Sequence, residues 1–303
     1  MASRTSGFVY ALLAYGVWGV FPIYFKALPD VPPDQVLAHR ILWSVVLLAA
    51  AVPLLGRWST VVRACRPIML LSALLIAANW GTYIWAVQNG RVLEASLGYF
   101  VNPLLSVLLG VVFLRERLRR RQVYAIGLAG IGVAALVIRL HALPWLPITL
   151  ALTFGLYGLV RKQAGVDAVG GLLVEASALA LPALGWLMLC ASRGTGAFGH
   201  GAATTALLVA AGPVTAVPLI WFAMGIRRLP LSTVGILQYV TPTLQFLLAV
   251  ALYHEHFGSA QAIAFGFIWS ALALYTWDSL QAARPGEAPG IGAATLPTPP
   301  AQG

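Results

Sequence analysis

The sequence predicts an all-α integral membrane protein with ten transmembrane helices, arranged as two inverted five-helix repeats. Three observations lead to this fold class. Hydrophobic residues make up 60% of the 303 residues and charged residues only 9%, which leaves too little polar surface for a water-soluble domain. Apolar stretches of about 20 residues, the length that spans a bilayer, follow one another along the chain. Polar residues also recur at one fixed spacing in the two halves of the chain.

The ten expected spans are separated by short connections. They cover residues 7–26, 35–55, 68–88, 93–114, 121–139, 145–161, 169–190, 203–225, 231–252 and 259–279. The short connections leave no room for a soluble catalytic domain. The chain has two lysines, Lys26 and Lys162, and no G-x-x-x-x-G-K motif, so ATP-driven transport by this chain alone is not expected. The segment 282–303 is rich in Pro, Gly and Ala and is expected to be a disordered cytoplasmic tail.

The basic residues predict the orientation of the chain, because cytoplasmic loops of membrane proteins are enriched in Arg and Lys. With a cytoplasmic N-terminus, fourteen of the 19 Arg and Lys residues face the cytoplasm and four face outside, with Arg40 inside a span. Both termini are therefore expected in the cytoplasm. The net charge of +10 is spread over short clusters between spans, without a continuous basic face. This distribution argues against a nucleic-acid partner.

A constant shift of 139 residues relates the two halves of the chain. It matches Gly16-Val17-Trp18-Gly19 to Gly155-Leu156-Tyr157-Gly158, Pro103 to Pro242, and Glu116 to Glu255. We therefore expect a first repeat over 7–140 and a second over 145–280. Because five is an odd number of spans, the second repeat must cross the membrane in the opposite sense. Inverted repeats are typical of secondary transporters.

Several motifs together resemble a known family. They are Trp18-Gly19 near Pro22 and Lys26, His39-Arg40, Asn79-Trp80, Glu94-Ala95-Ser96-Leu97-Gly98-Tyr99-Phe100, Asn102-Pro103, Tyr157-Gly158-Leu159-Val160-Arg161-Lys162 and Gln238-Tyr239. The chain resembles the EamA units of the drug/metabolite transporter superfamily, and its RarD branch most closely. The resemblance covers essentially the whole chain except the tail. It implies a ten-helix permease of the bacterial inner membrane, in a branch whose name is associated with chloramphenicol sensitivity, and it identifies no substrate.

Polar side chains within the spans are candidates for a substrate cavity, because a polar group inside a bilayer is costly unless it has a function or a partner. In the fourth span such residues share one helix face, and the shift of 139 places polar residues at the same positions of the ninth span. Hydrogen bonding between helices is the alternative; the symmetric placement favours two walls of a cavity. The expected cavity residues are Trp18, Arg40, Asn79, Tyr83, Tyr99, Asn102, Ser106, Tyr157, Gln238, Thr241 and Gln245.

Four further residues are candidates for coupling or gating: Lys26, His39, Glu94 and Glu175. Each has a simpler explanation. Lys26 could extend to the membrane surface, His39 could be a hydrogen-bonded structural residue, and Glu94 suits the start of a helix. Glu175 could carry a proton, pair with Arg40 or Lys26, or be protonated and hydrogen-bonded.

The function expected from these features is secondary active transport of a small metabolite or drug-like solute, with a proton as one candidate coupling ion. An uncoupled facilitator or exchanger is the alternative, and an intramembrane enzyme or a scaffold is less favoured, because no nucleophile–base pair is evident. No cofactor or metal is expected; His254-Glu255-His256 lacks the spacing of a zinc motif. The expected partners are the solute and the lipid bilayer, and the chain could act as a monomer or a homodimer.

Overall fold

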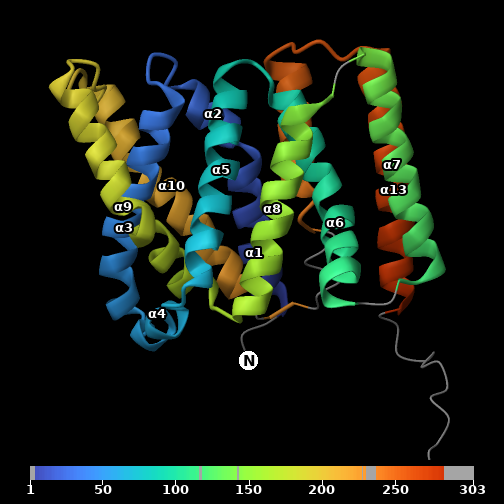
Figure 1. Ribbon diagram of the computed structural model, residues 1–303, viewed down its shortest axis with the longest axis horizontal. Helices are drawn as coiled ribbons and strands as arrows, with labels where there is room; N and C mark the ends of the chain where they lie inside the picture. Colours follow the sequence, from blue (N-terminus) through green and yellow to red (C-terminus); the bar gives the residue numbers. More distant parts are fainter. Residues whose placement is uncertain (1–3, 116–117, 142, 227, 230–236, 283–303) are drawn as a thin grey trace, which may run out of the picture.

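A computed structural model describes residues 4–115, 118–141, 143–226, 228–229 and 237–282. Within these ranges the chain is helical and contains no strand. Most of the helices run between the two ends of the molecule (Figure 1). They are α1 Arg4–Gly19, α2 Phe21–Lys26, α3 Pro33–Leu54, α4 Trp58–Ala64, α5 Ile68–Gln88, α6 Val92–Leu114, α7 Arg120–Leu140, α8 Trp145–Ala164, α9 Ala168–Ser192, α10 Ala202–Ile226, α12 Val240–Leu247, the π-helical turn η1 Leu248–Leu252, and α13 Ser259–Ala282.

Eight helical segments of the described residues are long and apolar enough to cross a membrane. Two shorter apolar helices, Trp145–Arg161 and Val240–Leu252, fall on the sixth and ninth predicted spans. The chain is thus a multi-pass membrane protein. The ninth predicted span begins at residue 231, and residues 230–236 lie outside the described residues, as does nearly all of the predicted tail at 282–303.

Two local features differ from the predicted spans. The first span is divided at Val20 into α1 and α2, with Pro22 in the first turn of α2, a position that proline favours because its missing N–H needs no partner there. The connection between the second and third spans contains the unpredicted helix α4. Helix α4 lies at the end of the molecule where the N-terminus lies (Figure 1). We call this the N-terminal end, and the opposite end the distal end.

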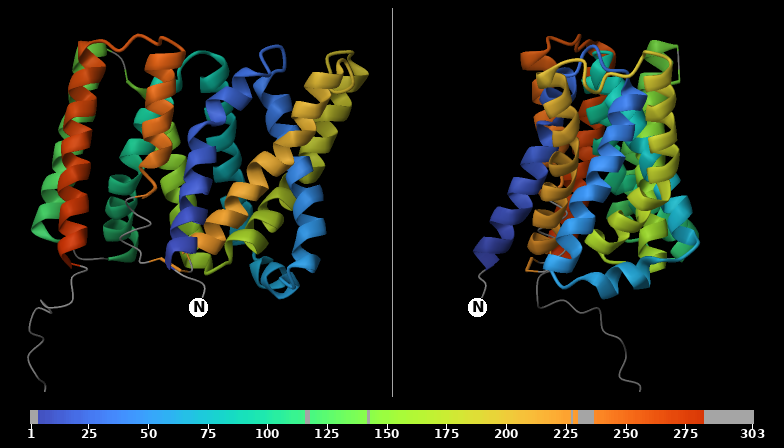
Figure 2. Two further views of the ribbon diagram at one scale, coloured as in Figure 1. Left: turned by 180° about the vertical axis from the view of Figure 1, so that it is seen from behind. Right: turned by 90° about the vertical axis from the view of Figure 1, so that its left-hand side faces the viewer.

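The helices pack in a defined set of neighbours. Helix α3 lies between α9 and α10, α1 contacts α10 and α12, and α8 contacts α5 and α6. Helices α7 and α13 form a pair at one side of the molecule (Figures 1 and 2). Glycine allows the closest approaches: a Cβ added at Gly212 of α10 would lie 2.5 Å from the carbonyl oxygen of Trp43 of α3.

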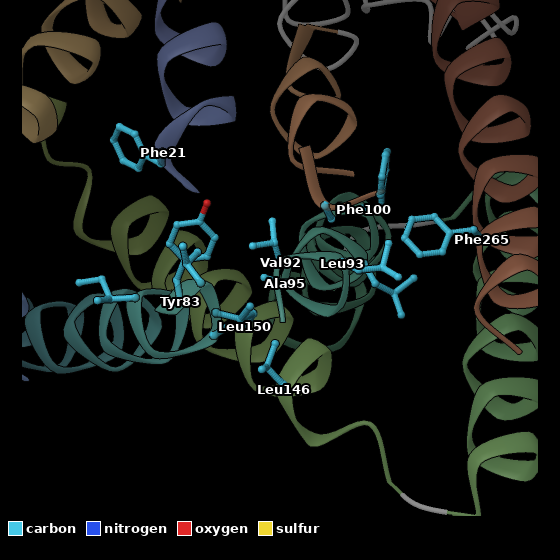
Figure 3. Packing of buried hydrophobic residues seen from close by; sticks show 14 of the residues in the cluster. Phe21, Tyr83, Val92, Leu93, Ala95, Phe100, Leu146, Leu150 and Phe265 are labelled. Atoms are coloured by element: carbon cyan, nitrogen blue, oxygen red, sulfur yellow. The ribbon is translucent and has the colours of Figure 1, made fainter. Parts of the chain in front are cut away.

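The largest apolar cluster joins α2, α5, α6, α8 and α13. Figure 3 shows part of it, including Phe21, Tyr83, Phe100, Leu150 and Phe265 of these helices. Large apolar side chains also cover the outside of the molecule, as expected for a surface that faces lipid. Several of the polar groups described next, Arg40, Asn79 and Glu175 among them, are buried between the helices, away from that surface.

Candidate functional site

Arg40 of α3 is a buried cation in contact with three aromatic rings. Its side chain is buried, with 4% of the residue exposed, and its Nε donates a hydrogen bond of 2.8 Å to Thr215 Oγ1 of α10. The guanidinium carbon lies 4.0 Å from the ring centre of Trp80. The ring centres of Phe21 and Phe25 lie 5.5 and 5.7 Å away. The rings stabilise the positive charge by cation–π interactions.

Within the described residues, Arg40 has no carboxylate partner. The ion pairs there are Arg57–Asp167, Arg91–Glu94, Arg119–Asp278 and Arg161–Glu175. In the same part of the chain, neither terminal nitrogen of the Arg40 guanidinium donates a hydrogen bond. An arginine side chain does not deprotonate in a protein, and burying an uncompensated charge costs several kcal/mol. The structure thus holds, buried between the helices, a positive charge whose two terminal nitrogens are free to donate hydrogen bonds.

Three more of the predicted cavity residues lie on neighbouring helices. Tyr99 of α6 donates a hydrogen bond of 3.1 Å to Asn79 Oδ1 of α5, and its ring lies edge-on to that of Tyr83, 5.5 Å between centres. Tyr83 also packs edge-on against Phe25, 5.9 Å between ring centres, and Phe25 is one of the three rings around Arg40. Among the described groups the buried hydroxyl of Tyr83 has no hydrogen-bond partner, and Figure 3 shows it pointing away from α5.

We call Arg40, Asn79, Trp80, Tyr83 and Tyr99 the central polar site. Asn79 is fixed in it, because its Nδ2 donates hydrogen bonds of 3.0 Å each to the Leu150 carbonyl and to Thr153 Oγ1 of α8. The site therefore contains a fixed amide, two phenol groups, an indole ring and one guanidinium. Such a set can bind an anionic group and stack against an apolar body.

The predicted polar stripe on the ninth span makes different contacts. Thr241 Oγ1 donates to the carbonyl of Tyr15 at 2.8 Å, and Gln245 Nε2 donates to the carbonyl of Trp18 at 3.2 Å. These bonds join α12 to α1. For these two residues the structure therefore shows hydrogen bonding between helices, the alternative to cavity lining. The Trp18 ring packs against Phe222, 5.5 Å between centres.

The other stripe residues are not drawn into one cluster. Asn102 is buried, and its Oδ1 has no partner among the described groups. Ser106 is exposed and Gln238 half-buried. The structure therefore brings together Arg40 of α3, Asn79 and Tyr83 of α5 and Tyr99 of α6, and places Thr241 and Gln245 of α12 against α1.

Glu175 of α9 forms a second buried polar cluster. Its carboxylate accepts hydrogen bonds from Arg161 at 3.0 Å, from Ser72 at 2.5 Å and from Tyr157 at 3.4 Å. The ionic partner of Glu175 is thus Arg161, and the pair with Arg40 or Lys26, one of the alternatives considered for Glu175, is not formed in the described part of the chain. Helix α8 continues to Ala164, beyond residue 161 where the sixth predicted span ends. Arg161 therefore lies within the helix and can reach the buried carboxylate of Glu175.

At the distal end, side chains of the two halves of the chain meet. The ammonium of Lys26 lies 3.9 Å from the ring centre of Tyr253. Glu94 pairs with Arg91 at 2.6 Å. His39 stacks on Phe198, 5.1 Å between ring centres.

Glu255 has a role that was not predicted. Its two carboxylate oxygens accept hydrogen bonds from the backbone N–H groups of Val92, at 2.9 Å, and Leu93, at 2.8 Å. Helix α6 has no side-chain cap of its own at Arg91, so Glu255 satisfies two N–H groups that every helix start leaves free. The missing cap is the signal in the sequence that could have indicated a distant acceptor. Burial raises the pKa of the Glu255 carboxyl, although these two N–H groups and Lys26 act in the opposite direction.

Comparisons with known proteins identify the family of the chain. Residues 5–138 match the model of the EamA-like transporter family. An "uncharacterized transporter" of Pseudomonas aeruginosa is 46% identical over 291 residues, covering 93% of this chain and 97% of that protein. "Protein RarD" of Escherichia coli K12 is 43% identical, covering 92% and 96%, and "Protein RarD" of Streptomyces exfoliatus is 40% identical, covering 93% and 91%.

One solved structure has the same fold. It covers 93% of this chain and 100% of its own, with a TM-score of 0.59 and 23% identity. At this identity the likeness shows the fold alone. The family match and the relatives along nine-tenths of the sequence establish the rest: the chain belongs to the EamA-like transporter family and is a RarD-type membrane transporter.

Proposed function

We propose that the chain is a secondary active transporter that carries a small solute across the bacterial inner membrane by alternating access, with the solute held in the central polar site. The observation that carries this proposal is Arg40, a buried cation with free donors. Its bond to Thr215 joins α3 of the first half to α10 of the second. A charged group within the membrane and between two halves is typical of a substrate site.

The neighbours of the helices support two inverted repeats over residues 7–140 and 145–280. The shift of 139 makes α1 equivalent to α8, α3 to α9, α5 to α10, α6 to α12 and α7 to α13. Under this equivalence, the contact between α6 and α8 corresponds to the contact between α12 and α1, and the structure contains both. The contact between α5 and α8 likewise corresponds to the contact between α10 and α1. The pairs α7–α13 and α3–α9 map onto themselves. A two-fold relation between the halves has this consequence.

The contacts at the distal end suggest a gate between the halves. Glu255 of the second half holds the start of α6 in the first half, and Lys26 lies on Tyr253 across the same boundary. In alternating access these contacts separate when the distal end opens. The excess of Arg and Lys in the loops at the N-terminal end supports an orientation with that end in the cytoplasm and the distal end outside.

Transport by the purified protein tests this function. A thermal-shift screen against amino acids, organic acids and amphenicol-like drugs selects ligands, and uptake of each is then measured in proteoliposomes. We expect uptake that increases with an imposed pH gradient. Uptake that does not respond to the gradient would replace the proton-coupled mechanism with an uncoupled facilitator. Ligands that bind but never cross the membrane would contradict transport.

A further inference from the structure

The free donors of Arg40 indicate what the solute carries. The planar guanidinium presents two terminal nitrogens at a spacing that matches the two oxygens of a carboxylate. In the described residues nothing accepts from them. We infer that the central polar site binds a monocarboxylate with a flat aromatic or apolar body, with Arg40 holding the carboxylate. This inference rests on the transport function proposed above and names its substrate class.

A single negative charge matches the charge of the site. Among the described cations, Arg40 is the one that contacts the rings of Phe21, Phe25 and Trp80. One guanidinium neutralises one carboxylate. A phosphate monoester carries a charge of about −1.5 to −2 near neutral pH, and its surplus charge would be buried without a counterion, which is unfavourable.

The same site lacks a partner for an ammonium group. The acidic side chains of the site's own and adjoining helices have other partners: Glu175 binds Arg161, Glu94 binds Arg91, and Asp34, at the start of α3, accepts a hydrogen bond from Trp186. An amino acid would bring its own positive charge next to Arg40, where no described carboxylate pairs with the guanidinium. A carboxylic acid without an amino group avoids this cost.

The aromatic composition of the site suits a flat body. Trp80 lies against the guanidinium, and the rings of Tyr83 and Tyr99 pack edge-on against each other; aromatic side chains of this kind favour contact with another ring. The Tyr83 hydroxyl is an additional donor, buried and without a partner among the described groups. It can donate to a carboxylate oxygen that Arg40 also binds.

Ligand charge provides the first test. Binding of phenylacetate to the full chain in lipid nanodiscs is measured by isothermal titration calorimetry near neutral pH. Matched ligands are 2-phenylethanol, 2-phenylethylamine, phenyl phosphate and L-phenylalanine. We expect phenylacetate to bind at least about tenfold more tightly than each of them, a difference that one charge-assisted hydrogen bond supplies. Equal binding of the alcohol, tighter binding of the amino acid, or no binding of phenylacetate would overturn the inference.

Two substitutions provide the second test. Arg40→Gln should weaken phenylacetate binding about 10- to 100-fold, and Arg40→Lys should weaken it less, because the charge remains while the planar fork is lost. Arg57→Gln is the matched control, since Arg57 pairs with Asp167 at the N-terminal end and should leave the affinity unchanged. A folded Arg40→Gln protein with full affinity would refute the site.

Tyr83→Phe keeps the test decisive if Arg40→Gln does not fold. The hydroxyl has no described partner, so its removal should leave thermal stability unchanged or higher, while phenylacetate binding weakens several-fold. Unchanged binding would count against the site. If phenylacetate binds in a way that depends on Arg40 but no solute is transported, the proposed function is overturned and the site is kept. Transport of another solute at full rate by Arg40→Gln keeps the function and overturns the site.

Discussion

The ion pair of Glu175 and Arg161 allows a quantitative prediction for Glu175→Ala. Glu175 has 1% of its side chain exposed and Arg161 has 14%. The substitution leaves the Arg161 guanidinium without its carboxylate, and the hydroxyls of Ser72 and Tyr157 lose an acceptor. Arg161 keeps its hydrogen bond of 3.0 Å to the carbonyl of Asp167, so part of its polar environment remains.

These contacts set the size of the effect. Removing one partner of a buried ion pair typically costs about 3–5 kcal/mol, because the other charge stays buried and unpaired. The bond that Arg161 retains places the expected loss near the lower limit, about 3 kcal/mol. Replacing both residues, as Glu175→Leu with Arg161→Met, should recover most of this loss, since apolar side chains of similar volume often replace a buried pair without net cost.

The free energy of unfolding is measured by titrating the protein in dodecyl maltoside with sodium dodecyl sulfate and following tryptophan fluorescence. Glu94→Ala is the matched control. Glu94 also pairs with an arginine, Arg91, but the two side chains are 33% and 32% exposed, and such a pair contributes about 0.2–1 kcal/mol. If Glu175→Ala unfolds no more easily than Glu94→Ala, burial does not govern the strength of these pairs and the reasoning is wrong.

Three further predictions concern the distal end and the helix packing. Glu255→Ala removes the cap of α6 and should lower the free energy of unfolding by about 0.5–2 kcal/mol, measured in the same titration; no change would show that water replaces the cap at no cost. Burial raises the pKa of the Glu255 carboxyl, so the folded protein binds the carboxyl proton more tightly than the unfolded chain does. The contribution of this proton to stability is therefore present at acid pH and lost as the pH rises. Glu255→Gln should therefore lose less thermal stability than the wild type between about pH 4 and about pH 7, and parallel curves would argue against this. Gly212→Ala forces a Cβ against the Trp43 carbonyl and should lower the free energy of unfolding by about 1–3 kcal/mol. Gly185→Ala, with no atom within 4 Å of the added Cβ, is the control and should be neutral or stabilising. Equal effects of the two substitutions would mean that α3 and α10 move apart freely.

The sequence predicts the membrane helices and several members of the central polar site for one physical reason. Polar groups are expensive in a bilayer, so Arg40, Asn79, Tyr83 and Tyr99 are conspicuous inside apolar runs. The structure brings these four together. Their role as a substrate site stays a prediction.

The pairing of distant groups could not be predicted from spacing. Glu255 caps a helix that begins more than 160 residues earlier, and Arg161 reaches Glu175 because α8 extends past its apolar segment. Both contacts depend on how helices pack, which hydrophobicity alone does not determine. For Thr241 and Gln245 the symmetric stripe favoured a cavity, but their side chains bind backbone carbonyls of α1.

The proposed repeat relates the helices of the two halves but not their buried charges. At a shift of 139 residues, the position of Arg40 is occupied by Leu179 and that of Glu175 by Val36. An inverted repeat lets the two halves exchange conformations, whereas the solute must meet the same chemical group in both states. A single cation at the boundary of the halves meets this requirement, because two equivalent arginines would repel each other and offer two competing sites. Under the proposed mechanism, the helices move with two-fold symmetry around an asymmetric site, and substitutions at Leu179 should leave recognition of the solute unchanged while those at Arg40 weaken it.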